Sequence, residues 1–184
     1  MIQSLLLASL LILPAPFQAT SLSGQPQAEK GVSCESAELK EFDFLLGEWQ
    51  GVERQTTPGA KPNAMTADVQ ITKNAQGCLL RENWTVYVDG RKAFGMFAIR
   101  SYEAKAKKWR LTYFGDDLSY EAWDSRKERD YWRFYREEIK EGKLMMVSVA
   151  WKLLAGDRFE QIMERSFDQG QTWTPRATLI FTRR

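Results

Sequence analysis

Residues 80–90 read Leu-Arg-Glu-Asn-Trp-Thr-Val-Tyr-Val-Asp-Gly, and this stretch decides the fold class. From residue 80 to 88 its side chains alternate in character, which is the pattern of a β-strand with one buried face and one solvated face. Asp89-Gly90 follows directly, and this dipeptide favours the two-residue turn of a β-hairpin. The stretch therefore predicts a strand that folds back on an antiparallel neighbour.

The two-residue period recurs on both sides of this stretch. Further alternating runs of strand length lie at residues 65–72, 109–113, 159–164 and 174–182. The run at 159–164 slips once, because Ile162 and Met163 are adjacent, and this slip predicts a β-bulge. Clusters of Gly, Asn, Asp and Pro between the runs are typical of turns.

These runs predict about ten strands joined in sequence by turns. Since no helical pattern is long enough for the crossover that parallel strands need, we expect antiparallel pairing throughout. The pattern favours an all-β, up-and-down antiparallel β-barrel, preceded by one short N-terminal helix within residues 36–46. Side chains can just fill a barrel of about eight strands, so a larger barrel leaves room for a ligand.

The first residues differ in kind from the rest of the chain. Leu5 to Leu13 is an apolar run about half as long as a spanning helix, followed by prolines and small residues. We interpret residues 1–19 as a secretory signal peptide, residues 20–33 as a disordered linker and residues 34–184 as the barrel domain. The prediction is an exported protein, periplasmic or secreted, without a membrane span; a disordered tail or a buried N-terminal helix is the alternative.

Composition excludes several classes of chemistry. The 26 basic and 24 acidic residues are interspersed and give a net charge of +2, so no basic stripe predicts nucleic-acid binding. The chain has no histidine, which removes Ser-His-Asp and Cys-His catalysis, His-ligated haem and most zinc and non-haem iron sites. We therefore expect no metal and no cofactor, and the sequence names no catalytic residue.

Cys34 and Cys78 are the only cysteines. In an exported protein an even pair favours a disulfide, with two free thiols or a metal site as the alternatives. A zinc site is disfavoured because there is neither a histidine nor a C-x-x-C spacing. Closing a loop of about 45 residues would stabilise the fold by roughly 4 kcal/mol in the chain-entropy model.

Residues 42–51 read Phe-Asp-Phe-Leu-Leu-Gly-Glu-Trp-Gln-Gly. This resembles the opening of the calycin-like barrels, which include lipocalins, fatty-acid-binding proteins and nitrobindin-type barrels and in which a helical turn leads into a Gly-x-Trp strand. The resemblance implies structural roles for Gly47, Trp49 and Gly51, with the indole closing one end of the barrel. It also implies that a basic residue near the C-terminus, Arg183 or Arg184, lies over that indole.

A second motif, Ser166-x-Asp168-x-Gly170-x-Thr172-Trp173, precedes the last strand. Together the two motifs resemble a bacterial secreted family of unknown function, with F-D-F-W-L-G-x-W near its start and S-x-D-G-G-x-T-W near its end. Nitrobindin-type relatives bind haem through a histidine, which this chain lacks, so the resemblance carries no haem site. We interpret the second motif as a structural turn whose aspartate binds backbone N–H groups above the packed tryptophan.

Aromatic residues are the main functional indication. The chain has seven Trp, six Tyr and ten Phe, and aromatic rings offer apolar area with a polar group. The predicted lining of a pocket comprises Trp84, Trp109, Tyr113, Trp123 and Trp151; the alternative is that they only fill the core. Charged residues also lie within strands, and an inward arginine would select a carboxylate-bearing ligand. These residues are Arg81, Glu82, Arg100, Arg110, Arg133, Glu164 and Arg165.

Three functions are compatible with these patterns. The first is binding of a small hydrophobic or amphipathic molecule by an exported barrel. The second is a His-independent isomerase, cyclase or hydrolase that uses pocket carboxylates such as Glu82 or Glu121 with a tyrosine. The third is a structural or interaction barrel with a filled core. The sequence does not predict the oligomeric state.

Overall fold

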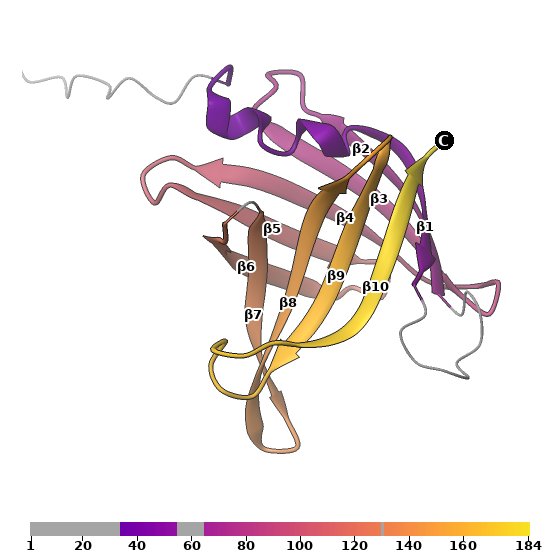
Figure 1. The fold of residues 1–184 in the computed structure, drawn as a ribbon, viewed down its shortest axis with the longest axis vertical. Coiled ribbons are helices and arrows are strands. Elements are labelled where there is room, and N and C mark those ends of the chain that lie inside the picture. The colour runs from indigo at the N-terminus through magenta and orange to yellow at the C-terminus, as the bar shows by residue number, and fades with distance from the viewer. Residues whose placement is uncertain (1–33, 55–64, 130) are drawn as a thin grey trace, which may run out of the picture. The chain divides into compact units, whose positions relative to one another are not determined.

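The computed structural model describes residues 34–54, 65–129 and 131–184. The signal peptide and linker expected at residues 1–33 lie outside these described residues. Ten strands form a closed barrel in which every strand pairs antiparallel with its neighbours in sequence and β1 pairs with β10 (Figure 1). The predicted fold class, an all-β up-and-down antiparallel barrel, is confirmed.

The strands are seven to thirteen residues long. The strands are β1 (Gly47–Glu53), β2 (Met65–Lys73), β3 (Leu79–Val88), β4 (Arg91–Glu103), β5 (Lys108–Gly115), β6 (Tyr120–Lys127), β7 (Trp132–Lys140), β8 (Lys143–Leu154), β9 (Arg158–Ser166) and β10 (Thr174–Arg183). The expected N-terminal helix is present as two 3-10 turns, η1 (Ala37–Lys40) and η2 (Asp43–Leu45). Within the described residues, no helix combines the length and the apolar character needed to cross a membrane.

Strand alternation decides which side chains enter the barrel. In β3, Leu80 and Trp84 are buried, whereas Arg81 between them is exposed. The β3–β4 turn uses Asp89 and Gly90 at φ 49° and 75°, the positive values that a type I′ hairpin requires. The alternation predicted from residues 80–90 is thus the alternation of the structure.

The predicted bulge in β9 is wrong. Residues 158–166 pair with β8 without a register shift, and the irregularity lies opposite, in β10 between Pro175 and Ala177. The sequence pattern slipped because Gln161 is buried on β9 while Ile162, the next residue, is only half-buried. A polar residue at an inward position therefore produced the same break in the alternation that a bulge would produce.

One end of the barrel, here called the closed end, is plugged by η1 and η2. Leu39, Phe42 and Leu45 from this segment are buried. The ring of Phe42 meets Trp109 edge-on, with ring centres 4.9 Å apart. The indole N–H of Trp49 donates to the carbonyl of Leu45 at 2.7 Å, which fixes the plug against the first strand.

Arg183 lies over the indole of Trp49, as the resemblance implied for Arg183 or Arg184. Its guanidinium is 4.1 Å from the ring centre, and Nη1 donates to the carbonyl of Leu46 at 2.7 Å. Gly47 has φ +124°, and a Cβ there would lie 2.3 Å from Arg183 Nη1. Glycine is favoured at this position because L side chains rarely adopt this positive φ, and the arginine also passes close to the backbone.

Gly51 leaves room at the seam where β1 closes the barrel against β10. It pairs with Phe181, and a Cβ at residue 51 would lie 2.5 Å from that ring. Any side chain here would displace a fully buried phenylalanine.

The connection from β9 to β10 is the structural turn expected from the second motif. The Asp168 carboxylate accepts hydrogen bonds from the Ser166 hydroxyl at 2.7 Å and from the Thr172 hydroxyl at 2.6 Å. The amide of Gly170, at φ +79°, donates to the Ser166 hydroxyl at 2.8 Å. The hydrogen bonds from Thr172 contribute most to lowering the pKa of Asp168 to about 2, so the carboxylate is ionised at neutral pH.

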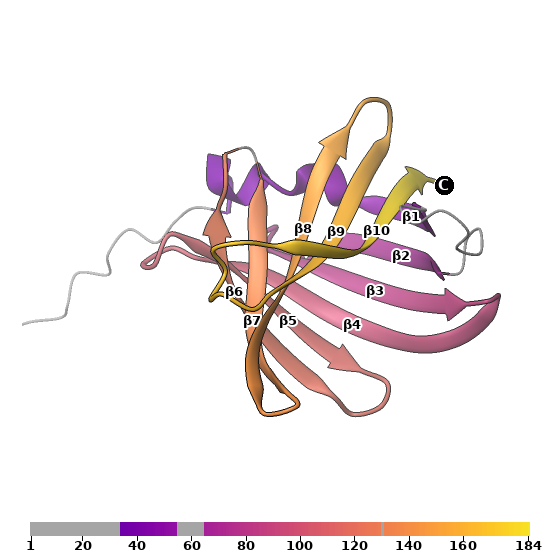
Figure 2. The same ribbon diagram turned by 60° about the horizontal axis from the view of Figure 1, so that its bottom comes forward.

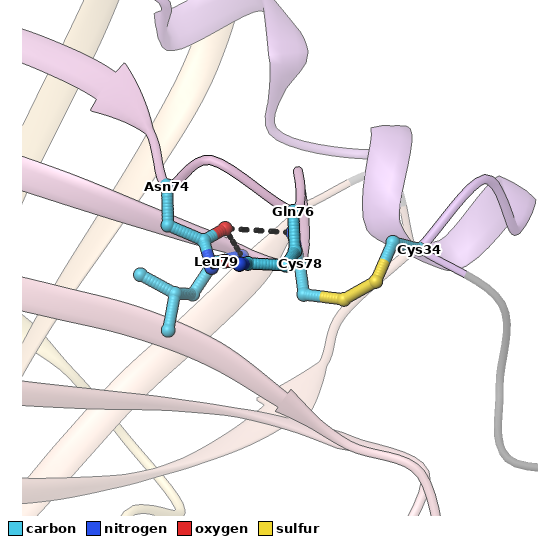
Figure 3. The surroundings of a disulfide bond; sticks show 5 residues. All are labelled: Cys34, Asn74, Gln76, Cys78 and Leu79. Carbon is cyan, nitrogen blue, oxygen red and sulfur yellow. Dashed lines mark hydrogen bonds between the residues drawn. A yellow bond between two sulfur atoms is a disulfide. The ribbon is translucent and has the colours of Figure 1, made fainter.

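A disulfide joins Cys34 to Cys78 and confirms that prediction (Figure 3). Cys78 lies in the β2–β3 turn, where the side-chain oxygen of Asn74 accepts from the amides of Cys78 at 2.8 Å and Leu79 at 3.1 Å. Cys34 precedes η1. The bond therefore ties the plug at the closed end to a turn that is already held by its own hydrogen bonds.

Replacing both cysteines, Cys34→Ser with Cys78→Ser, should lower the free energy of unfolding by about 3–4 kcal/mol, because the unfolded chain regains the freedom of the cross-linked loop. Urea denaturation followed by tryptophan fluorescence measures the change. A reducing agent should lower the wild-type stability to the same value and leave the double variant unaffected. Equal denaturation midpoints for wild type and variant would show that the bond contributes nothing.

Candidate ligand-binding cavity

A cavity of about 560 Å³ occupies the half of the barrel toward the β3–β4, β5–β6 and β7–β8 turns, here called the open end. This volume lies within the range of small-molecule sites, about 300–1,000 Å³. Its wall is largely apolar and includes Trp84, Val86, Met96, Trp123, Val149, Met163 and Leu179. The methionines add adaptable apolar surface.

The predicted pocket aromatics divide between the two halves of the barrel. Trp84, Tyr113 and Trp123 line the cavity. Trp109 and Trp151 do not; they are 0% and 1% exposed and belong to the packed closed half. Both groups point inward, so alternation alone could not separate them. Their positions along the strands separate the two groups. Trp109 is the second residue of β5 and lies beside the plug, whereas Tyr113 lies toward the other end of the same strand.

A buried ion pair, Glu82 with Arg100, lies beneath the cavity. Both side chains are fully buried, and Arg100 Nε donates to Glu82 Oε1 at 2.8 Å. The second carboxylate oxygen accepts from the indole N–H of Trp84 at 3.0 Å. Because Trp84 is also part of the cavity wall, the ion pair supports the cavity from below.

Aromatic faces surround the arginine of this pair. The Arg100 guanidinium lies 4.0 Å from the ring centre of Trp151, 4.4 Å from that of Phe42 and 5.0 Å from that of Phe134. Neither Nη1 nor Nη2 has a hydrogen-bond acceptor among the described residues; Nη2 lies 2.8 Å from Glu82 Oε1 as an ion pair, and the ring faces supply further stabilisation. Arg100 thus points inward, but its charge is used by Glu82 and not offered to a ligand.

Arg133 is another of the charged residues that the sequence places within strands, and it is buried, with 6% of its surface exposed. It forms ion pairs with Glu164 and with Glu128, the latter at 3.0 Å, and donates to the Ser148 hydroxyl at 2.8 Å. Its guanidinium lies 4.6 Å from the ring centre of Trp173, the last residue of the β9–β10 motif. This cluster therefore fastens the turn to the barrel wall.

Two polar side chains in the cavity wall have no hydrogen-bond partner among the residues that the structure describes. Tyr113 is 9% exposed and Gln161 is 7% exposed, and both line the cavity. Neither the Tyr113 hydroxyl nor the Gln161 amide forms a hydrogen bond within the described part of the chain. Burial, followed by the nearby charge of Glu82, raises the pKa of Tyr113 well above its usual value. The phenol therefore remains a hydrogen-bond donor at physiological pH.

The mouth of the cavity carries a second charged network. Arg136 on β7 donates to Glu121 on β6 at 2.7 Å and to Glu138 at 2.5 Å. The other Glu121 oxygen accepts from the indole of Trp123 at 3.1 Å. Two carboxylates thus share one guanidinium at the rim.

This network spans an interruption in the barrel wall. β6 pairs with β5 through Tyr120–Trp123 but with β7 only through Asp124–Lys127. Figure 2 shows β6 and β7 diverging beyond that region. The ion pair between Glu121 and Arg136 therefore joins the two strands where backbone pairing has stopped.

The chemistry of the site favours recognition over proton transfer. Both oxygens of Glu82 and both oxygens of Glu121 already accept hydrogen bonds from the protein. Tyr113 holds its proton firmly because its pKa is raised. Within the described residues, no group of three or more acidic, Cys or His side chains could hold a metal ion. What the cavity offers is apolar area and unused hydrogen-bonding groups.

Removing one partner of the buried ion pair should destabilise the fold strongly. Arg100→Met leaves Glu82 buried without its ion-pair partner, and we expect a loss of about 3–5 kcal/mol in the free energy of unfolding. The double variant Glu82→Gln/Arg100→Met should recover most of this loss, because no charge is then stranded. Arg81→Met, on the exposed face of β3, is the matched control and should change stability by less than about 0.5 kcal/mol. A single variant no less stable than the control would contradict the pairing.

The raised pKa of Tyr113 makes stability depend on alkaline pH. Above pH 10 the unfolded chain releases this proton while the folded chain retains it, so stability falls as pH rises, by up to about 1.4 kcal/mol per pH unit. Chemical denaturation of wild type and Tyr113→Phe between pH 9 and 11 should show a shallower decline in the variant. Parallel declines would mean that Tyr113 titrates normally.

Comparison with known proteins bears on the fold. No protein-family model matches the sequence, and no curated protein matches it. Among solved structures, the chain is similar to the crystal structure of Rv2717c from M. tuberculosis, with 13% sequence identity and a TM-score of 0.50 over 81% of this chain and 98% of that chain. At this identity the likeness shows the fold alone, and it supports the calycin-like class of barrel.

Proposed function

We propose that this protein binds a small hydrophobic or amphipathic molecule inside the barrel. One observation carries the proposal: a cavity of about 560 Å³ with a largely apolar wall into which Tyr113 and Gln161 bring polar groups that the protein leaves unused. Neither the open cavity nor the unused polar groups would be expected in a structural barrel whose core is filled by its own side chains.

The energetics of these polar groups support an occupant. A buried polar group without a partner costs about 1–3 kcal/mol, and water or a ligand must satisfy it. A ligand that displaces the water gains from the apolar wall and keeps the hydrogen bonds, which is the balance typical of small-molecule sites. Tyr113 and Gln161 would then orient the ligand, and the aromatic wall would supply most of the binding free energy.

The proposal includes export. The apolar run Leu5–Leu13 has the length of a signal-peptide core, and cleavage after Ala19 would leave the linker and the barrel domain as the mature protein. The Cys34–Cys78 disulfide supports an oxidising compartment. The motifs at residues 42–51 and 166–173 support membership of the bacterial secreted barrel family that they resemble.

Filling the cavity should abolish binding without unfolding the barrel. Ala177 lines the cavity and is only half-buried, so Ala177→Phe projects a ring into the open space. Ala155→Phe, in the exposed β8–β9 turn, is the matched control. We expect the fluorescence of 1-aminoanthracene to rise with wild type and with the control, and to show at least ten-fold weaker binding to Ala177→Phe.

Native mass spectrometry of the same three proteins provides a second measurement. A co-purifying ligand should appear as added mass on wild type and Ala155→Phe, and should be absent from Ala177→Phe. If the dye binds all three proteins equally, binding occurs outside the barrel and the proposal is wrong.

A further inference from the structure

We infer that the cavity selects an uncharged amphipathic ligand bearing a hydroxyl or carbonyl group and rejects the corresponding carboxylate. The inference rests on the proposed function and names its ligand class. It follows because Arg100 in the depth of the barrel and Arg136 at its mouth are both paired with glutamates of the protein.

The depth of the barrel offers no free cation. Arg100 is the inward arginine that could have received a carboxylate, and it is fully buried against Glu82 at 2.8 Å. Its guanidinium is also enclosed by the rings of Trp151 and Phe42. A ligand carboxylate at the cavity floor would therefore approach Glu82 without gaining an ion pair, and burying an unpaired charge is costly.

The mouth also lacks a buried, unpaired cation among the described residues. Among the described residues that line the cavity, the basic side chains are Arg136 and Arg176. Arg136 is shared by Glu121 at 2.7 Å and Glu138 at 2.5 Å, so a ligand anion there meets two carboxylates for one guanidinium. Arg176 is exposed at the β10 irregularity, and an ion pair made in water contributes at most about 1 kcal/mol.

The unused groups are suited to a neutral partner. The Tyr113 hydroxyl keeps its proton and donates, and the Gln161 amide both donates and accepts. They come from β5 and β9, which are four strands apart in the barrel order, so they reach a ligand from different sides. A hydroxyl or carbonyl group can accept from Tyr113, and it needs no counter-ion.

Displacement of 1-aminoanthracene by 1-decanol and by decanoate at pH 8 tests the inference, because the two compounds share a chain length and differ in the charge of the head group. We expect 1-decanol to bind wild type at least about ten-fold more tightly than decanoate. Tyr113→Phe should weaken 1-decanol binding about five-fold through the lost hydrogen bond. Decanoate binding as tightly as 1-decanol, or more tightly, overturns the inference.

A charge-switch variant tests the cause of the selectivity. Glu121→Gln/Glu138→Gln leaves Arg136 without its carboxylates, so decanoate affinity should rise at least about ten-fold while 1-decanol affinity changes little. Glu137→Gln removes the same kind of charge from an exposed position between Arg136 and Glu138 and should leave both affinities unchanged. An equal response in the two variants would contradict the role of the rim.

The two proposals fail in different ways. If 1-aminoanthracene binds wild type and Ala177→Phe equally, the cavity is not a binding site and the proposed function fails. If the dye requires the open cavity but decanoate displaces it best, or neither compound displaces it, the proposed function stands and the ligand class inferred here is wrong.

Discussion

The ion pair between Glu82 and Arg100 is the constraint on which the interior of this barrel depends. Two charges without solvent contact persist only when each is matched, and here Glu82 receives Arg100 on one oxygen and the indole of Trp84 on the other. Arg100 in turn must be enclosed by ring faces, which Trp151 and Phe42 provide. Below this pair the barrel is packed, and above it the barrel is hollow. The pair is therefore the boundary between the part that holds the fold together and the part that is free to hold something else.

The N-terminal segment reaches this boundary through a continuous set of contacts. The disulfide fixes Cys34 to the β2–β3 turn, and eight residues later Phe42 covers the guanidinium of Arg100 at 4.4 Å. Arg100 holds Glu82, and Glu82 orients Trp84 in the cavity wall. The plug, the ion pair and the cavity floor are thus connected by direct contacts, although they come from distant parts of the sequence. The position of the cavity floor follows from how the closed end is sealed.

Local patterns in the sequence were sufficient for the strands, the turns and the disulfide, because strands and turns depend on neighbouring residues and the sequence has a single pair of cysteines. Local patterns were insufficient where a residue's role depends on its depth in the barrel or on the register between strands. Trp109 and Tyr113 lie on the same face of β5, yet one is packed and the other lines the cavity. The pairing of Glu82 with Arg100 depends on the β3–β4 register, which sets Glu82 opposite Ala98 and Arg100 opposite Leu80. Gln161 gave a signal, the broken alternation of β9, but a bulge explains the same pattern until the pairing is known.

If the cavity binds the ligand class that we infer, its selectivity would come from which polar groups are paired within the protein and which are not. A protein that offers a free arginine inside an apolar cavity attracts any carboxylate of suitable length, since the charge dominates the shape. Here Glu82 cancels Arg100, and Glu121 with Glu138 cancels Arg136, so hydrogen bonds and shape are left to discriminate. Discrimination by unused hydrogen-bonding groups is strong, because a ligand that lacks the matching group leaves Tyr113 and Gln161 unpaired in a desolvated wall. In the proposed function, the residues that stabilise the barrel would thereby also determine which ligands it excludes.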